Sequence, residues 1–235
     1  MPDAIAAMER CVNEIRAWML CDKLKINDGK TEFVIIGTHQ QLSKVHVDLL
    51  AVGGAQVSPV QSVKNLGTWI DSNTSLQVNI NNTCKAAYYY ITNVRRIRKY
   101  LSKKATQTLV HALIIGRIDY CNSILYGLPA KQIAKLQRLQ NSKARLIFKI
   151  PRFYHISPIL CTLHWLPVEF RIHFKIIKIT FKAINGQAPV YLQENISKRE
   201  EQRYNLRSCA MAIMLQTPRT LPKKTLGDCA FLAAG

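Results

Sequence analysis

Acidic residues are scarce in this chain, which has 14 Asp and Glu against 33 Lys and Arg in 235 residues. The shortage falls after residue 82, where 6 acids face 26 Lys and Arg, whereas residues 1–82 hold 8 acids and 7 Lys and Arg. Metal-assisted phosphoryl transfer needs carboxylates a few ångströms apart, and the sequence has no acidic dyad suited to it. We expect Asp119 to form a local ion pair with Arg117 or to cap its helix. The sequence therefore predicts a binding protein without chemistry of its own.

Patterns typical of metal and cofactor sites are missing as well. His155, Cys161, His164 and His173 follow spacings of six, three and nine residues, which match no zinc motif. Gly53-Gly54 is too short for a phosphate-binding loop, and no Lys-Ser or Lys-Thr follows it. Nothing singles out a Cys–His nucleophile. We expect no metal, no cofactor and no small-molecule substrate for this chain.

Long apolar runs and an N-terminal secretion signal are absent from the sequence. The longest apolar stretches are well short of the roughly 18 residues of a membrane-spanning helix, and residues 1–11 lack a basic region followed by an apolar one. The seven cysteines are scattered, odd in number and without a C-x-x-C pair. We therefore expect an intracellular protein, nuclear or cytoplasmic, with no membrane segment and with reduced thiols mostly packed in the core.

What the chain has in excess is positive charge, with a formal net charge of +19 at pH 7. Residues 1–82 carry a net charge of −1 and residues 83–235 carry +20. Positive charge that is concentrated in one part of a chain attracts polyanions, and nucleic acid is the commonest polyanion inside cells. Nonspecific adhesion and a surface kept soluble by self-repulsion are the alternatives, and we favour nucleic acid over both.

Residues 1–75 have the pattern of a small α+β unit. Apolar residues recur at three- and four-residue steps over 3–21, which predicts a helix. Stretches rich in β-forming residues predict further strands at 31–36, 44–50, 55–58 and 62–70. Gly53-Gly54 is typical of a hairpin turn, so we expect antiparallel pairing.

Helical periodicity dominates after residue 75. It predicts helices at 76–100, 103–122, 130–149 and 168–185. Ser102 is the expected N-cap of the second helix, and Pro167 sets the start of the fourth, with Trp165 buried beside it. Gly186 and Pro189 are expected to end that helix.

The predicted fold class is therefore α+β, with a small N-terminal helix-plus-antiparallel-strand unit followed by a mainly α-helical region. Residues 196–235 have no sustained period, and we expect them to form a weakly ordered tail. The chain is accordingly divided into four expected regions, 1–75, 76–150, 151–195 and 196–235.

Two of the predicted helices carry cations along one side. At 100° per residue, those of the third helix fall within an arc of about 80°, next to an apolar face; they are Lys131, Lys135, Arg138, Arg145 and Lys149. The fourth helix repeats the arrangement with Arg171, Lys175, Lys178 and Lys182, and the junction of the first two adds Arg95, Arg96, Arg98, Lys99, Lys103 and Lys104. Such faces follow a phosphate backbone by charge without reading bases. The alternative is that each stripe is only the solvated side of a helix.

Several motifs resemble, in order, segments of one protein family. "WMLCDKLKINDGKTEFVIIG" is similar to the segment after the catalytic Asp-Asp strand of reverse transcriptases from non-LTR (LINE-type) retrotransposons, and "VKNLGTWID" resembles the Leu-Gly primer-grip strand that follows it. The thumb and C-terminal region of Jockey-like and chicken-repeat-like members resemble "RIDYCNSILYGLP", "LQRLQNSKARLIF", "HISPILCTLHWLPVEFRIHFKI", "APVYL" and "YNLRS". The resemblance covers nearly the whole chain.

The resemblance implies a role for each region. Residues 1–75 would be the end of a palm with motif-D-like and primer-grip-like segments, 76–150 a thumb-like region and 151–195 a helical C-terminal region. Lys30 would lie near the phosphates of the incoming nucleotide, and Leu66-Gly67 would form the turn that approaches the primer end. An ordinary turn lysine and a plain hairpin turn are the alternatives for these two places.

The chain also departs from the family pattern. The Asp-Asp strand, the fingers and most of the palm lie upstream of the segment that begins at Met1, and the Mg²⁺ ions of the polymerase would belong to that missing palm. Cys21-Asp22 stands where an Asn is usual, and Ser142-Lys143 stands where small apolar residues are typical. We expect no polymerase activity from this chain alone and, at most, binding of RNA or an RNA–DNA hybrid through phosphates.

The leading hypothesis is thus a truncated C-terminal fragment of a retrotransposon RNA-directed DNA polymerase. Three alternatives stay open. The first is a domesticated nucleic-acid-binding module. The second is a helical protein-interaction module whose charge serves an acidic partner, and the third is a decayed copy with no selected function.

Overall fold

The computed structural model describes residues 2–45, 47, 49–196 and 215. The fold class is α+β, as expected, because helices predominate and the strands pair into small two-stranded antiparallel sheets. The chain divides into two compact units, Met1–Asn79 and Ile80–Gly235. The tail expected at 196–235 lies outside the described residues, apart from residues 196 and 215.

The first unit begins with a helix and a hairpin. The helix, α1 (Pro2–Cys21), has nearly the bounds that its apolar periodicity predicts. β1 (Leu50–Val52) pairs antiparallel with β2 (Ala55–Val57) across the Gly53-Gly54 turn, so the expected hairpin is present. Its first strand begins at Leu50 and not at residue 44, because residues 42–45 turn through backbone hydrogen bonds of their own.

Polar contacts join α1 to the rest of this unit. Glu9 accepts a hydrogen bond from the Ala51 N–H at 3.0 Å. The guanidinium of Arg16 donates to both carboxylate oxygens of Asp28, and this contact lowers the pKa of Asp28. Gly53 has a φ of +62°, and a Cβ there would lie 2.3 Å from Nη2 of Arg16. Glycine is therefore favoured at this position by the positive φ of the turn, and a Cβ would in addition displace the end of the Arg16 side chain.

At 62–70 the structure has one more strand than the β-forming pattern indicated, because a turn lies at Leu66-Gly67, where the family resemblance implied one. The stretch 62–70, expected as one strand, is a hairpin of β3 (Ser62–Asn65) and β4 (Thr68–Asp71). Its turn is Leu66-Gly67, where both residues have positive φ, 45° and 91°. Positive φ at both central positions gives a turn whose twist matches that of the paired strands. The prediction of a single strand was wrong because Leu66 is a residue that seldom adopts this conformation.

The strand expected at 31–36 is also wrong. This segment is extended but makes only a single parallel bridge, between Phe33 and Pro59, with the Val60 N–H donating to the Phe33 carbonyl at 2.7 Å. A proline at the bridge lacks the donor that a longer ladder needs. The short helix α2 (His39–Leu42) follows, with a capping box formed by Thr38.

Asp71 connects the second hairpin to the helices. Its carboxylate accepts hydrogen bonds from the N–H groups of Ser75 and Leu76 at 3.0 and 2.8 Å. Side-chain oxygens that accept from nearby backbone N–H groups are typical of the turn before a helix. This turn leads directly into α3 (Gln77–Ile97), in whose first turn the two units meet along the chain.

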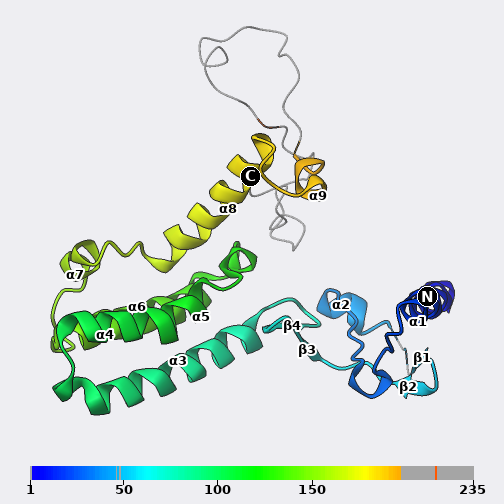
Figure 1. Cartoon of the computed structure of the whole chain (residues 1–235), viewed down its shortest axis with the longest axis horizontal. Helices are drawn as coiled ribbons and strands as arrows, with labels where there is room; N and C mark the ends of the chain where they lie inside the picture. Colours follow the sequence, from blue (N-terminus) through cyan, green and yellow to red (C-terminus); the bar gives the residue numbers. More distant parts are fainter. Residues whose placement is uncertain (1, 46, 48, 197–214, 216–235) are drawn as a thin grey trace, which may run out of the picture. The chain divides into compact units, whose positions relative to one another are not determined.

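The second unit is mainly helical in its described part (Figure 1). After α3 its helices are α4 (Lys103–Val110), α5 (Gly116–Asp119), α6 (Ala130–Phe148), α7 (Ser157–Thr162), α8 (Val168–Ile184) and α9 (Val190–Gln193). The helices predicted at 76–100, 130–149 and 168–185 are confirmed within a few residues. α6 packs against α4, α7 and α8.

The helix predicted at 103–122 is interrupted. Ser102 caps α4 as expected, with its Oγ accepting from the Ala105 N–H at 3.1 Å. A π-helical turn, His111–Ile115, then separates α4 from α5. α5 ends at Asp119 because Tyr120 is extended, and Cys121, with φ of 50°, then leads into a 3-10 turn, Asn122–Leu125. Single π-helical turns of this kind occur within α-helices, and apolar periodicity does not indicate them.

A single hydrophobic core holds the helices of this unit together. It is formed by apolar side chains of α3, α4, the π-helical turn, α5, α6 and α7, and it includes Trp165, which is buried as predicted. Leu139 of α6 and Ile114 of the π-helical turn are fully buried within it. α8 buries Ile172 and Ile176 on one face, outside this cluster. The core therefore fixes the outer faces of α3, α6 and α8, where the cations lie.

The segment before α8 is positioned by two glutamines of α6. Gln137 accepts a hydrogen bond from the Val168 N–H at 2.9 Å, so it caps α8 from another helix. Gln140 donates to the Leu166 carbonyl at 2.8 Å. Pro167 precedes the first residue of α8, as predicted. The "HWLP" motif is thus a helix start that is anchored on α6.

No helix in the part of the chain that the structure describes is long and apolar enough to cross a membrane. The expectation that the cysteines pack mostly in the core is wrong for the described ones. Cys11, Cys21, Cys121 and Cys161 are exposed, and only Cys84 is half-buried. They lie on polar helix faces and in turns, where a small side chain needs no core contact.

Candidate nucleic-acid interface

Cations from three stretches of the second unit line one cleft of about 720 Å³. Its walls come from α3 and the turn after it, from the C-terminal half of α6, and from the segment that follows α6. We call this the cationic cleft; it is lined by Tyr88, Arg95, Arg98, Lys99, Ser142, Arg145, Leu146, Lys149, Ile150 and Arg152. None of these residues is acidic. The cleft therefore concentrates positive charge without a neutralising partner in its wall.

The end of α6 places two of these cations. Lys149 follows the last helical residue with φ of 56°, and its N–H donates to the Arg145 carbonyl. This left-handed cap ends the helix and turns the chain so that Arg152 lines the same cleft. Nη2 of Arg145 donates to the Tyr154 carbonyl at 3.4 Å, whereas its Nε is buried and has no partner among the described residues. Arg145 thus retains an unused donor in the cleft wall.

Arg98 lines the cleft but does not act as a free cation. Its Nε, Nη2 and Nη1 donate to the carbonyls of Leu146, Ile147 and Leu101 at 3.1, 2.8 and 2.8 Å. The last carbonyls of a helix lack intrahelical partners and carry partial negative charge. Arg98 therefore caps α6, and the sequence-based expectation that it contacts phosphates is corrected.

Other expected contacts are also occupied. Lys103 places its Nζ 3.6 Å from the centre of the Phe148 ring, a cation–π contact. Lys135 donates to Oδ1 of Asn81 at 3.1 Å. The remaining cations of this group are exposed at the surface outside the cationic cleft; they are Arg96, Lys104 and Lys131.

Asp119 pairs with a residue that the sequence pattern does not indicate. Nη1 of Arg171 lies 2.9 and 2.8 Å from its two carboxylate oxygens, and Nε of Arg171 donates to the Leu166 carbonyl at 3.0 Å. Arg117, the expected partner, instead stacks on the Tyr90 ring at 5.0 Å. Arg171 is consequently a structural residue that joins α8 to α5, whereas Lys175, Lys178 and Lys182 on the same helix are exposed.

The expected sites of the first unit lie in turns. Lys30 ends a single 3-10 turn, Asp28–Lys30, and is exposed. Leu66 and Gly67 form the β3–β4 turn, and the Leu66 side chain is 85% exposed. Both are ordinary turn positions, and the roles implied by the family resemblance stay predictions.

Lys143 is the one cation of α6 that lies in the core. Its side chain is only 1% exposed, and burial, with a further contribution from the charge of Arg171, lowers its pKa to about 7. Asp119 acts in the opposite direction. The family resemblance implies only that small apolar residues are typical at this position. Lys143 is therefore a source of strain in the fold and takes no part in the cationic cleft.

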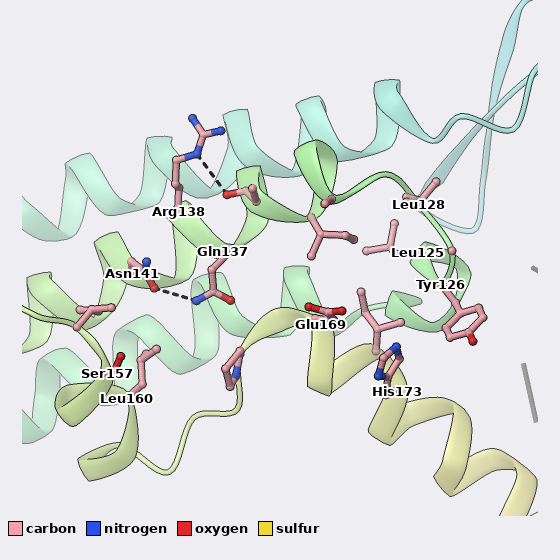
Figure 2. Close-up of a pocket in the computed structure, with 17 residues that line it drawn as sticks. Leu125, Tyr126, Leu128, Gln137, Arg138, Asn141, Ser157, Leu160, Glu169 and His173 are labelled. Carbon is pink, nitrogen blue, oxygen red and sulfur yellow. Dashed lines mark hydrogen bonds between the residues drawn. The ribbon is translucent and has the colours of Figure 1, made fainter. Parts of the chain in front are cut away.

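A second cavity, of about 780 Å³, lies where the "YGLP" turn and the "HWLP" segment meet α6 (Figure 2). Figure 2 shows Gln137 donating to Asn141 on α6, with Glu169 and His173 on α8 across from them. Arg138, an expected phosphate contact, lines this cavity and not the cationic cleft. Because Glu169 brings a carboxylate to its wall, this cavity suits an anion less well.

The cationic cleft was only partly visible in the sequence. Arg95, Lys99, Arg145 and Lys149 were expected, but Tyr88, Ser142 and Arg152 were missed. Arg152 lies beyond the end of the predicted helix, so a stripe counted at 100° per residue cannot include it. The excess of positive charge after residue 82 was the signal that pointed to this region.

Among the described residues no three His, Cys, Asp or Glu side chains come together in a way that could hold a metal ion. Comparisons with protein-family models, with curated proteins and with solved structures found no match for this chain.

Proposed function

We propose that the second unit binds nucleic acid through the phosphates of its backbone, which lie in the cationic cleft. One observation carries this proposal. Arg95 and Lys99, at and just after the end of α3, and Lys149 and Arg152, just after α6, line one concave surface that has no acid in its wall. Cations that converge in this way favour a polymer of closely spaced negative charges over a single anion.

Binding in the cleft is electrostatic and independent of sequence. Each lysine or arginine that neutralises a phosphate releases a condensed counterion, which is the main source of nonspecific affinity. The contacts of the cleft are to phosphate and sugar, so they set position and carry no base recognition. RNA and an RNA–DNA hybrid are the proposed ligands.

We further propose that the chain derives from the C-terminal part of a non-LTR retrotransposon reverse transcriptase. The support is the order of its motifs, from the Lys-Thr-Glu segment at Lys30 to the "HWLP" segment before α8. In this proposal residues 1–75 are the end of a palm and the helices that follow are thumb-like. The chain contributes grip on the nucleic acid and performs no polymerisation alone, and any Mg²⁺ ions belong to the rest of the palm.

Salt dependence tests the binding proposal. Fluorescence anisotropy of the full chain with a labelled RNA–DNA hybrid should give an affinity that falls steeply and linearly in log–log form as salt rises. An affinity that does not respond to salt would contradict backbone contact.

A charge-neutral variant of the cleft locates the site. The combined variant replaces four cations of the cleft, with Arg95→Gln, Lys99→Gln, Lys149→Asn and Arg152→Gln. The slope of log affinity against log salt concentration should become shallower by roughly one unit for each phosphate that is no longer neutralised. Asn is chosen at 149 because it tolerates the left-handed conformation. The matched control removes the same charge from exposed sites outside the cleft, with Lys85→Gln, Arg96→Gln, Lys104→Gln and Lys131→Gln. Equal reductions in both variants would mean that the charge is diffuse and the cleft is not the site.

A primer-extension assay tests the proposed lack of polymerase activity. The purified chain, a primed RNA template, deoxynucleotides and Mg²⁺ should give no extended product. Extension would show that this chain has its own catalytic site and would overturn that part of the proposal.

A further inference from the structure

Helix α8 presents a row of exposed apolar side chains that the cationic cleft does not use. Phe170, Phe174, Ile177 and Phe181 are 56%, 57%, 65% and 61% exposed. At 100° per residue they fall within an arc of about 60°, and they extend over about 16 Å of the helix. The core face of α8, which includes Ile172, lies on another side of the helix. We call these four residues the aromatic row.

Lysines run beside the aromatic row on one side only. Lys175, Lys178 and Lys182 are exposed, and their arc is centred about 100° around the helix from the row. Side chains one turn apart on a helix are about 5–6 Å apart, which corresponds to one or two nucleotides of a strand. The other side of the row carries Glu169 and His173 and no Lys or Arg.

This one-sided arrangement distinguishes between possible occupants. An unpaired strand has phosphates along one edge and bases along the other, so lysines on one side and aromatic rings beside them match both at once. Phenylalanine rings stack on any base, because every base has a π-face. An anionic membrane or an acidic amphipathic helix is matched better by cations on both sides of an apolar stripe, and Glu169 disfavours such a partner on the second side.

A cavity beside the row adds independent support. Phe174, Lys175 and Lys178 also line a space of about 450 Å³, together with Asn122 and Trp165. Asp119 lines it as well, but its carboxylate is paired with Arg171. Oδ1 of Asn122 and Nε1 of Trp165 are buried and have no hydrogen-bond partner among the described residues. Buried polar groups are normally paired, so these two residues of the cavity wall have hydrogen-bonding capacity that the described residues do not satisfy.

We propose that α8 binds a stretch of unpaired nucleic acid, with bases stacked on Phe170, Phe174 and Phe181 and phosphates on the adjacent lysines. The inference rests on the proposed function, because it concerns the same class of polymer. It assigns the unpaired strand to a different face from the cationic cleft.

The test compares single-stranded and duplex binding by the full chain. The triple variant Phe170→Leu, Phe174→Leu and Phe181→Leu keeps the row apolar but removes its rings. Anisotropy with a labelled single-stranded RNA should show at least about tenfold weaker binding, while binding of an RNA–DNA hybrid stays within about twofold. The matched variant with Tyr at the same positions retains flat rings and should bind the single strand nearly as well as the wild type. Circular dichroism checks that both variants keep their helices.

The outcomes separate this inference from the proposed function. Unchanged single-strand binding in the leucine variant would overturn the inference and leave hybrid binding in the cleft standing. Failure of the wild type to bind the hybrid, with ring-dependent single-strand binding, would sustain the inference and overturn the proposed function. If phosphatidylserine vesicles bind the wild type and the leucine variant equally and neither protein binds single strands, the face is apolar and membrane-directed, and the inference fails.

Discussion

In the first unit, Leu50, Val52 and Leu76 are the buried hydrophobic side chains among the described residues, whereas the second unit buries a continuous core. The first unit leaves Trp18 at 67% and Leu20 at 59% exposure. The arrangement of its elements depends on polar contacts made by α1 and on turns with positive φ. The comparison shows that similar apolar content can be stabilised in two ways, by packing or by a few specific contacts.

Truncating one leucine in each unit tests this comparison most strongly. Leu139→Ala, at a fully buried position of α6, should lower the free energy of unfolding by about 2–5 kcal/mol, because the core cannot collapse around the cavity. Leu50→Ala, in β1, should cost less, since few buried side chains surround it. Hydrogen–deuterium exchange within residues 80–196 and within residues 2–79 measures the two effects. Equal reductions in protection would show that the first unit also depends on packing.

Replacing Lys143 in the second unit should stabilise the fold, whereas the leucine truncations should destabilise it. Lys143→Met should raise the free energy of unfolding at pH 7 by about 1–4 kcal/mol, because it removes a buried ionisable group and keeps the volume. Lys131→Met, at an exposed position of the same helix, is the control and should have little effect. Denaturant titration of the full chain measures both. A destabilised Lys143→Met variant would mean that the ammonium group has partners that stabilise the fold.

The pH dependence of the same residue has a defined direction. Lys143 has a pKa of about 7 in the folded chain and an ordinary value of 10.5. Between these values the unfolded state binds the proton and the folded state does not, so stability should rise as the pH rises from about 7 to about 10. Below pH 7 both states are protonated and this contribution is constant. The rise should be absent from Lys143→Met.

Gly53 tests the turn-dependent order of the first unit. Gly53→Ala places a Cβ against the Arg16 guanidinium at a positive φ, and it should destabilise this unit by about 1–3 kcal/mol. Gly54→Ala is the control, because nothing lies within 4 Å of its Cβ position. Hydrogen exchange in α1 and β1 measures the difference. Equal behaviour of the two variants would contradict the close packing of Arg16 on the turn.

The smallest effect is expected from Asp28. Asp28→Asn removes the negative charge and one of the two oxygens that accept hydrogen bonds from Arg16. It should destabilise the first unit only slightly at neutral pH, because this pair is near the surface. The pKa of Asp28 is lowered by Arg16, so its contribution is present above the ordinary carboxyl pKa and is lost as the pH falls through the folded value. Thermal unfolding at pH 7 and at acidic pH should show a difference between variant and wild type only at pH 7.

Some expected elements were accurate because their signals are local. α6 and α8 have apolar residues at three- and four-residue spacing, Ser102 supplies a cap, and Pro167 precedes a helix start. These features depend on neighbours in sequence. The helix expected at 103–122 is confirmed over 103–119, with a π-helical turn inside it. The strand at 31–36 was wrong because sheet pairing depends on residues far away along the chain.

The candidate site shows the same division. Arg95, Lys99, Arg145 and Lys149 were identified from charge alone, and the cationic cleft unites them. Arg98 and Arg171 carry the same charge, but their guanidinium groups are occupied by carbonyls and by Asp119. A sequence gives the type of each side chain but not the group that its donors reach.

The sequence by itself determined that the chain is α+β, that its later part is helical, and that this part is strongly cationic, because composition and periodicity are local properties. The tertiary structure decided which cations converge on the cleft, which cap a helix and which one, Lys143, is buried. The reason is that exposure and hydrogen-bond partners are set by the packing of helices that are distant in the chain, as α3 and α6 are around Arg98.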